Sequence, residues 1–297
     1  MPLNDNDWIT EVFSDRTAFS VRSTGKFFEE VSPFQKIEIF QTDVMGRVLL
    51  LNGCFMVTEK DAFIYHEMLV HPAMAVLSAP RKALVIGGGD GGAITELVKY
   101  PLLETIILCE IDPRVVESCR EYMPAISAGL DDPRVKLVFE DGALFVREHR
   151  NEFDLVLVDS TDPVGPGVVL FEMPFYESVA ASVTENGIAV FQTESPLFME
   201  DVFVTALSLL RKVFGPDCAH PYFATIPCYP GGLWSFTFCS RRHNPIREAP
   251  TGDDPAIRGL TRYYDRRVHE AAFVPPVFVG RLIQEKGRLR TQPDGPR

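Results

Sequence analysis

Acidic side chains stand at the ends of several apolar runs in this 297-residue chain. The first of them, Asp90, lies inside a glycine turn at residues 87–92, which reads Gly-Gly-Gly-Asp-Gly-Gly and follows the apolar run 83–86. A glycine turn that opens a helix lets a nucleotide-like ligand approach the backbone N–H groups. A carboxylate in such a turn repels phosphate and attracts a cation. The turn therefore predicts a nucleoside ligand with positive charge rather than a dinucleotide.

Two further acids follow the next apolar runs and suit the rest of a nucleoside. Glu110 ends the run 105–109, about 20 residues beyond the turn, where α/β nucleotide binders place the acid that accepts ribose hydroxyls. Asp141 and Gly142 follow the run 135–139, and a carboxylate at that strand end can accept the exocyclic amine of adenine. Asp-Gly is also common in plain turns, so this assignment depends on the acids upstream.

A pair of carboxylates at the next strand end suits proton transfer. Asp159 ends the run 154–158, and Asp162 follows in a loop before Pro163. Ligands of open α/β sheets bind at the carboxyl ends of the strands. Two acids there can bind an ammonium group and accept its proton, whereas the simpler interpretation makes Asp162 only a turn former.

Other polar and aromatic residues stand where they could surround such a ligand. Tyr65 and His66 lie on a predicted helix, Gln192 closes another apolar run, and Tyr229 stands in a proline-rich loop. Taken alone, a tyrosine such as Tyr229 is more often a packing residue than a functional one.

The elements that must position these residues fall into two parts. Residues 1–60 are β-rich, and Asn52-Gly53 between two apolar runs is a strong hairpin signal. From residue 61 onward the expected helices, at 61–76, 91–99, 113–122, 172–184 and 200–213, alternate with expected strands at 83–87, 105–110, 135–139, 154–159, 187–192 and 234–239. Such alternation predicts an α/β fold, in which a Rossmann-like, doubly wound, mostly parallel sheet at 61–297 follows a small N-terminal β domain at 1–60. The polar tail after residue 286 is expected to fray.

Composition narrows the compartment and the partners. The formal net charge of −12 disfavours nucleic acid and anionic membranes and modestly favours cationic small molecules. The six cysteines form no Cys-x-x-Cys pair and are expected to be reduced and buried. His71, His220 and His269 lack metal-ligand spacing, so no metal site is expected. The acidic N-terminus does not read as a signal peptide, and no apolar run approaches the roughly 18 residues of a membrane helix, so we expect a cytoplasmic protein.

The ordered set of motifs resembles the polyamine aminopropyltransferases, the spermidine synthase family. The matching segments lie at residues 32–35, 58–68, 86–92, 110–112, 159–166, 226–230, 262–264 and 268–273. Glycine turns recur in many folds, but an aspartate inside the turn together with the second aspartate motif at 159–166 is far more specific.

The resemblance implies a methyltransferase-like fold and transfer of the aminopropyl group of decarboxylated S-adenosylmethionine to a diamine, usually putrescine. No cofactor is implied, because the donor is a co-substrate. The family is commonly dimeric or tetrameric, so a homodimer or homotetramer is implied, with the N-terminal β domain helping assembly.

Residue roles are also implied by the resemblance. The donor-binding residues would be Gln35, His66, Asp90, Glu110, Asp141 and Gly142. The diamine-binding residues would be Tyr65, Asp159, Asp162, Gln192 and Tyr229, and Asp159 would also be the catalytic acceptor of the amine proton. The segment from residue 161 to about residue 173 would close over the site.

Two departures from the family pattern concern the identity of the acceptor more than the reaction. The family hairpin often carries Gln where this chain has Met56, and Cys228 stands where Thr is common.

Three other functions compete with this interpretation. The turn also fits the Gly-x-Gly-x-x-Gly pattern of nicotinamide dehydrogenases, but Asp90 argues against pyrophosphate. An S-adenosylmethionine-dependent methyltransferase would rarely need two acids and tyrosines set for a diamine. A non-catalytic regulator that binds a nucleoside or polyamine would not need both Asp159 and Asp162.

Overall fold

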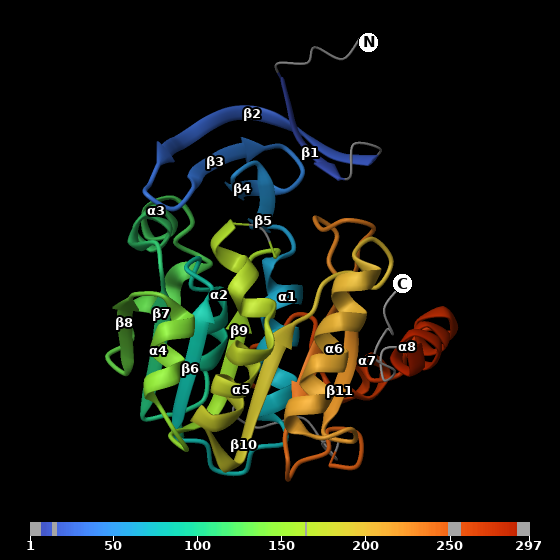
Figure 1. Ribbon diagram of the computed structural model, residues 1–297. Helices are drawn as coiled ribbons and strands as arrows, with labels where there is room; N and C mark the ends of the chain where they lie inside the picture. Colours follow the sequence, from blue (N-terminus) through green and yellow to red (C-terminus); the bar gives the residue numbers. More distant parts are fainter. Residues whose placement is uncertain (1–6, 14–16, 164, 249–256, 290–297) are drawn as a thin grey trace.

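Two β-sheets build the molecule (Figure 1), and the computed structural model describes residues 7–13, 17–163, 165–248 and 257–289. The smaller sheet is antiparallel and contains, in spatial order, β1 (Trp8–Phe13), β2 (Thr17–Val31), β3 (Lys36–Thr42), β4 (Gly46–Leu51) and β5 (Cys54–Thr58). Asn52 and Gly53 between β4 and β5 have φ values of 52° and 83°, the left-handed backbone that a two-residue hairpin turn requires. The predicted hairpin is confirmed.

The larger sheet has the order β11-β12-β10-β9-β6-β7-β8. Its parallel strands are β6 (Lys82–Gly87), β7 (Thr105–Glu110), β8 (Val135–Phe139), β9 (Phe153–Asp159) and β10 (Val183–Gln192), and β12 (Leu233–Cys239) and β11 (Ala219–Thr225) are antiparallel at one edge. The predicted fold class, a Rossmann-like mostly parallel sheet with an N-terminal β domain, is confirmed. The strand β11 was not predicted, because His220 and Pro221 interrupt its apolar pattern. Proline is tolerated there because β11 is an edge strand.

The order of the strands reverses beside β6. After β8 the chain returns to the other side of β6, so β9 is its second neighbour and Gly87 pairs with Asp159. Ligands of open α/β sheets bind outside the carboxyl ends of the strands at this kind of switch point.

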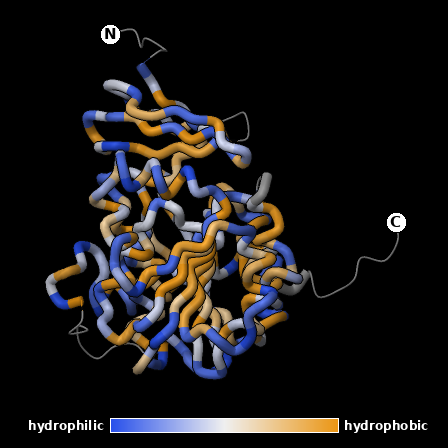
Figure 2. The backbone as a smooth tube through the Cα atoms, turned by 90° about the vertical axis from the view of Figure 1, so that its left-hand side faces the viewer, coloured by the Kyte–Doolittle hydropathy of each residue, from blue (hydrophilic) through white to orange (hydrophobic). Residues whose placement is uncertain are grey.

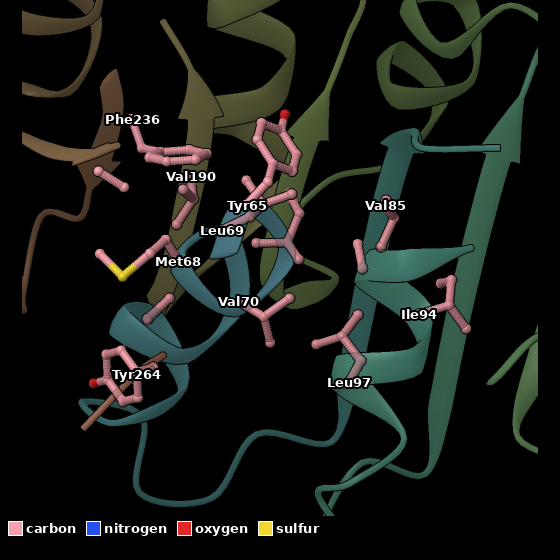
Figure 3. Packing of buried hydrophobic residues seen from close by; sticks show 14 of the residues in the cluster. Tyr65, Met68, Leu69, Val70, Val85, Ile94, Leu97, Val190, Phe236 and Tyr264 are labelled. Atoms are coloured by element: carbon pink, nitrogen blue, oxygen red, sulfur yellow. The ribbon is translucent and has the colours of Figure 1, made fainter. Parts of the chain in front are cut away.

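Helices cover both faces of the larger sheet (Figure 1). One face packs against α1 (Ala62–Met74), α2 (Gly92–Leu97) and α7 (Arg266–Ala272), and the other against α4 (Gly142–Glu148), α5 (Met173–Ser182), α6 (Glu200–Phe214) and α8 (Val277–Leu289). Figure 2 shows the hydrophobic strands gathered at the centre, and Figure 3 shows Met68 and Leu69 of α1 in one cluster with Val190 and Phe236 of the sheet. The sequence predicted α1, α2, α5 and α6, together with α3 (Pro113–Tyr122), but not α4, α7 or α8.

The smaller sheet is seated on α3 (Pro113–Tyr122). Ile37, Ile39 and Leu49 of β3 and β4 form a buried cluster with Val115 and Cys119 of α3. This packing places the smaller sheet above the carboxyl ends of the parallel strands (Figure 1).

The remaining expectations about the chain have mixed outcomes. All six cysteines are free, and Cys54 and Cys218 are only partly buried. The expected frayed tail is helical as far as Leu289, and residues 290–297 lie outside the described residues. The division into domains at residue 60 stays a prediction; β5 ends at Thr58 and α1 begins at Ala62. Within the described ranges, no helix combines the length and apolar character needed to cross a bilayer.

Candidate functional site

A cavity opens at the switch point, between the carboxyl ends of the strands and the smaller sheet. Its polar lining comes from Gln35, Asn52, Cys54, Tyr65, Asp90, Glu110, Asp141, Asp159, Ser160, Thr161, Asp162 and Tyr229. Gly87, Gly88, Gly89 and Gly142 also line it, as does Met56 of β5. The structure therefore brings most of the predicted site residues together around one space. The exceptions are His66 and Gln192, whose side chains lie one layer behind the lining.

The glycine turn fits closely against the end of β9. Gly87 and Gly88 have φ values of 77° and 69°. A Cβ atom on Gly87 would lie 2.2 Å from the carbonyl oxygen of Asp159, and one on Gly88 would lie 2.6 Å from Asp159 Oδ2. Glycine is required here for its backbone conformation and for the close approach of the two strand ends.

Asp90 forms an ion pair with His66 at the floor of the cavity. Asp90 Oδ1 accepts the Gly92 N–H at 2.6 Å and lies 3.2 Å from His66 Nε2. Burial alone would lower the pKa of His66, but the Asp90 charge and hydrogen bond outweigh it and raise that pKa to about 9. The pKa of Asp90 is lowered, since His66 outweighs the opposing effect of burial. Asp90 is therefore a carboxylate at neutral pH.

Asp159 has a different electrostatic environment. Tyr65 Oη donates to Asp159 Oδ1 at 2.7 Å, while Asp159 Oδ2 is buried without a hydrogen-bond partner. Burial and the neighbouring Asp90 charge raise the pKa of Asp159 to about 6, against the opposing effects of His66 and Tyr65. Asp159 thus combines a fixed orientation with an open acceptor atom, which are the properties of a general base.

His66, Asp90 and Asp159 together have the geometry of a cation site. Ligand atoms of His66, Asp90 and Asp159 all lie within 4.8 Å of one another. An ammonium group could occupy this space as well as a metal ion, because both are cations attracted by carboxylates.

Two buried carboxyl groups that the sequence pattern did not single out lie behind the lining near Asp162. Glu194, which follows β10, is fully buried with Oε1 accepting from Gln192 Nε2 at 3.1 Å and with Oε2 unpartnered. Burial and the Asp162 charge raise the pKa of Glu194 well above its usual range. Glu11 of β1 accepts the Phe55 N–H at 2.8 Å, and burial, with Asp162 contributing, raises its pKa to about 7.

Glu11 and Glu194 lie behind the lining residues Asp162 and Cys54. The sequence held a weak signal for Glu194, which follows a predicted strand end like the other site acids. Glu11 stands in an ordinary strand pattern far from Asp162 in the chain, so nothing in the sequence pointed to it.

The acids predicted to bind the donor also have structural partners. Glu110 Oε1 accepts the Asp112 N–H at 2.9 Å, and burial raises the pKa of Glu110 to about 7. Asp141 Oδ1 caps α4 by accepting the Ala143 N–H at 2.7 Å. Gln35 Nε2 donates to Asp112 Oδ2 at 3.0 Å. These contacts fix the side chains at the rim of the cavity, and their predicted contacts with a donor stay predictions.

An aromatic wall closes the side of the cavity near Asp159. The Tyr65 and Tyr229 rings lie 5.7 Å apart in an edge-to-face arrangement, and Tyr229 Oη donates to the Met56 carbonyl oxygen at 2.7 Å. Of the two departures from the family pattern, Met56 lines the cavity, whereas Cys228 is buried behind it and its N–H donates to Asp61 Oδ2 at 2.9 Å.

A loop covers the same side. Thr161, Asp162, Gly167, Val169 and Leu170 of the segment predicted to close over the site all line the cavity. Part of this segment forms a short 3-10 helix, η3 (Gly165–Phe171), and residue 164 lies outside the described residues.

A Rossmann-like sheet with carboxylates around its switch point belongs to the class of proteins suited to binding small cationic molecules. Comparison with known proteins gives the family. Residues 62–248 match the family model described as the spermine/spermidine synthase domain, and residues 7–59 match the spermidine synthase tetramerisation domain. The chain belongs to the spermidine synthase family and is an enzyme of the polyamine aminopropyltransferase type.

Individual relatives are similar over nearly their whole length. The polyamine aminopropyltransferase of Thermoanaerobacter sp. (strain X514) is 44% identical, covering 94% of this chain and 99% of the relative, and that of Moorella thermoacetica is 42% identical, covering 93% and 96%. A spermidine synthase solved with the transition-state analogue AdoDATO has a TM-score of 0.88 and 37% identity, covering 94% of this chain and 95% of that one. The spermidine synthase of Thermotoga maritima has a TM-score of 0.86 and 35% identity, covering 93% and 94%.

Proposed function

We propose that the protein transfers the aminopropyl group of decarboxylated S-adenosylmethionine to putrescine, giving spermidine and methylthioadenosine. The observation that carries this proposal is the pair of unlike carboxyl groups at the switch point. Asp90 is paired with His66 and stays ionised, whereas Asp159 has a raised pKa and an unpartnered oxygen. Two acids in such different environments suit two tasks, binding a cation and accepting a proton.

The donor would lie across the glycine turn. Asp90 would bind the ammonium of the aminopropyl arm, Glu110 the ribose hydroxyls, and Asp141 with Gly142 the adenine, while Gln35 would contact the donor from the smaller sheet. His66 would act through Asp90, since it contacts that carboxylate from behind.

The acceptor would lie along the aromatic wall between two acidic ends. Its reacting amine would face Asp159 and Tyr65, and its second amine, as an ammonium, would face Asp162, with Glu11 and Glu194 behind it. Gln192 would hold Glu194 in place through its 3.1 Å hydrogen bond. Tyr229 would complete the wall.

The chemical step requires a neutral amine. An alkylammonium with a pKa near 10.4 is neutral in roughly 1 of 2,500 molecules at pH 7, a deficit worth about 4–5 kcal/mol. Asp159 would take the proton, and the nitrogen would attack the carbon beside sulfur. As the N–C bond forms, the C–S bond breaks, and its electrons stay on sulfur, which becomes a neutral thioether. The sulfonium needs no general acid, and a closed loop would keep water out.

Incubation with the donor and a panel of diamines, followed by mass analysis of the products, tests this proposal. Methylthioadenosine together with spermidine is expected, with putrescine giving the highest kcat/KM. Methylated products formed from S-adenosylmethionine would support the methyltransferase alternative, and ligand binding without turnover would support the regulator. Preference for cadaverine, agmatine or a longer polyamine would overturn the choice of acceptor alone.

We further propose that no resident metal or other cofactor takes part, because the donor is a co-substrate whose own ammonium would occupy the space beside Asp90 and Asp159. Dialysis against a chelator is expected to leave turnover unchanged, and a loss restored by one added metal would contradict this. We also propose a homodimer or homotetramer in the cytoplasm. The match to a tetramerisation domain and the exposed Val31 and Val44 on the smaller sheet support the oligomer, which light scattering would test.

A further inference from the structure

Glu67 is a buried carboxylate for which the proposed reaction has no direct use. It follows His66 on α1 and is 1% exposed. Its Oε1 accepts the N–H of Arg262 at 2.8 Å, and its Oε2 accepts the N–H groups of Tyr263 and Tyr264, each at 2.8 Å. Three consecutive peptide N–H groups thus converge on one carboxylate, which is a strong, charge-assisted way to hold an anion in the interior.

The segment that supplies these N–H groups is itself fixed. The Oη of Tyr264 lies 2.8 Å from His269 Nδ1, and His269 Nε2 lies 2.9 Å from the carbonyl oxygen of Pro245. The guanidinium of Arg262 lies 3.8 Å from the ring centre of Phe63 on α1. Figure 3 shows Tyr264 in the same buried cluster as α1. We call residues 262–273 the C-terminal brace.

The middle turn of α1 is held from more than one side. Tyr222 Oη donates to the Met68 carbonyl oxygen at 2.8 Å, and Glu67 adds the link from this turn to the brace. Asp61, before the first turn, accepts from Thr58 Oγ1 at 2.6 Å, and His71, near the other end, contacts Glu96 at 2.8 Å. The turn between them carries Tyr65 and His66 toward the cavity and Glu67 toward the brace. The Glu67 carboxylate, fixed by three hydrogen bonds, therefore lies on the same turn as Tyr65, whose hydroxyl donates to Asp159.

We propose that Glu67 is a positioning residue, which ties α1 to the C-terminal brace and thereby sets the Tyr65 hydroxyl against Asp159. The inference rests on the proposed function, because it assumes that the bond from Tyr65 to Asp159 serves the reaction. That bond is 2.7 Å long, and hydrogen bonds of this kind weaken steeply when distance or angle departs from the optimum. A loosened helix would leave both residues present but wrongly oriented.

The charged and titratable groups facing Asp159 provide a specific readout. These are Asp90 on the glycine turn, Tyr65 and His66 on α1, and Tyr229 on the neighbouring loop. Among them, Tyr65 lowers the pKa of Asp159 through its hydrogen bond. Loss of that bond moves the acid limb of the kcat/KM profile to higher pH, whereas a purely structural weakening of the fold leaves the limb in place.

The experiment compares Glu67→Gln, Tyr65→Phe and the double variant with the wild type. Glutamine keeps the size of Glu67 but replaces one accepting oxygen with an NH₂ group that faces N–H donors. We expect Glu67→Gln to lower kcat/KM for putrescine by about 10-fold and to leave the affinity for the aminopropyl donor within about twofold of the wild type. The acid limb of the kcat/KM profile should move to higher pH. The double variant is expected to lose no more than Tyr65→Phe alone, since both changes act on one bond.

Controls separate the possible outcomes. Glu270→Gln removes an exposed carboxylate of the brace that pairs with Arg266 and should behave as the wild type. If Glu67→Gln does not fold, Arg262→Leu loosens the brace without altering the buried carboxylate, and the acid limb should still rise. Two results would overturn the inference alone. In the first, Tyr65→Phe is impaired while Glu67→Gln keeps the activity and the acid limb of the wild type. In the second, the losses of the two single variants multiply in the double variant. A fully active Tyr65→Phe would contradict the proposed role of Tyr65 and, with it, the inference.

Discussion

Asp90 and Asp159 are chemically identical side chains that their neighbours make different. Asp90 has a protonated histidine behind it and stays ionised across the physiological range, so it is suited to holding a cation. Asp159 has a tyrosine hydroxyl on one oxygen and nothing on the other, and its pKa rises to about 6. A base with a pKa near 6 is a better proton acceptor than an ordinary aspartate and is still mostly ionised at pH 7.

Replacing Asp159 tests its role as the base. In Asp159→Asn the Tyr65 hydroxyl can still donate to the amide oxygen, so the local geometry should survive. We expect donor affinity, measured by calorimetry, to stay nearly intact while kcat falls at least about 10²-fold, as for the loss of a general base. Turnover near that of the wild type would refute the assignment.

Replacing Asp90 tests donor selection. S-adenosylmethionine carries a carboxylate that the decarboxylated donor lacks, and the Asp90 charge would repel it. Asp90→Asn keeps an acceptor for the Gly92 N–H but removes the charge, so we expect S-adenosylmethionine to become a relatively stronger inhibitor. Asp131→Asn, which changes an exposed acid, is the matched control. Equal relative inhibition of Asp90→Asn and wild type would count against this role.

At the scale of elements, the glycine turn matters because it lets β6 and β9 meet. Gly87→Ala would place a methyl group 2.2 Å from the Asp159 carbonyl oxygen at a φ of 77°. We expect a cost of about 1–2 kcal/mol for the left-handed backbone, and more for the displaced end of β9. Both the melting temperature and the turnover should therefore fall.

The control for this substitution is Gly280→Ala on α8, where a Cβ atom meets nothing within 4 Å. A helical glycine replaced by alanine should gain about 0.5–1 kcal/mol. If Gly87→Ala were as active and stable as Gly280→Ala, close contact at the switch point would not be required.

The sequence was informative where function sits at the ends of strands. Asp90, Glu110 and Asp159 each follow an apolar run, and parallel strands bring such ends together by topology alone. It was uninformative where a role depends on distant partners. Glu11 meets the Asp162 charge only after folding, and Glu67 is recognisable only from the N–H groups of residues 262–264. The short α4 and the proline-containing β11 lack the periodicity that prediction needs.

The sequence also does not indicate whether a side chain lines the cavity or lies behind the lining. Tyr65 and His66 are adjacent in the sequence, yet Tyr65 lines the cavity and His66 supports Asp90 from below. Gln192 likewise contacts Ser160 and Glu194 rather than the open space. Packing decides between such positions, and packing leaves no local sequence signal.

For the molecule as a whole, the buried carboxyl groups at the site should lower the free energy of unfolding of the ligand-free protein as pH rises. Burial raises the pKa values of Glu11 and Glu110 to about 7, and the pKa of Glu194 lies higher. The His66 pKa rises to about 9 because Asp90 outweighs burial. Each of these groups holds its proton to higher pH in the folded state than in the unfolded chain. The folded state therefore binds more protons, and the free energy of unfolding falls as pH increases.

We expect this decline from about pH 5, above the ordinary pKa of a glutamate, to about pH 9, where His66 titrates in the folded state. His220 and His269 have lowered pKa values because of burial, and they oppose the trend below about pH 7, where the unfolded chain protonates them. Denaturant titrations of the ligand-free enzyme at several pH values measure the effect. Glu194→Gln should make the free energy of unfolding depend less steeply on pH and should weaken binding of the acceptor. Stability that increases with pH across this window would contradict the prediction.

The C-terminal brace sets a lower limit on how short a working version of this enzyme can be. The family model ends at residue 248, and a fragment cut there would look complete by that measure. In that fragment the Glu67 carboxylate would nevertheless lose the three hydrogen bonds that it accepts, because the N–H groups of residues 262–264 would be missing. Anyone trimming or fusing this polypeptide should retain it at least through Phe273, where the last buried aromatic of that stretch packs against Tyr222.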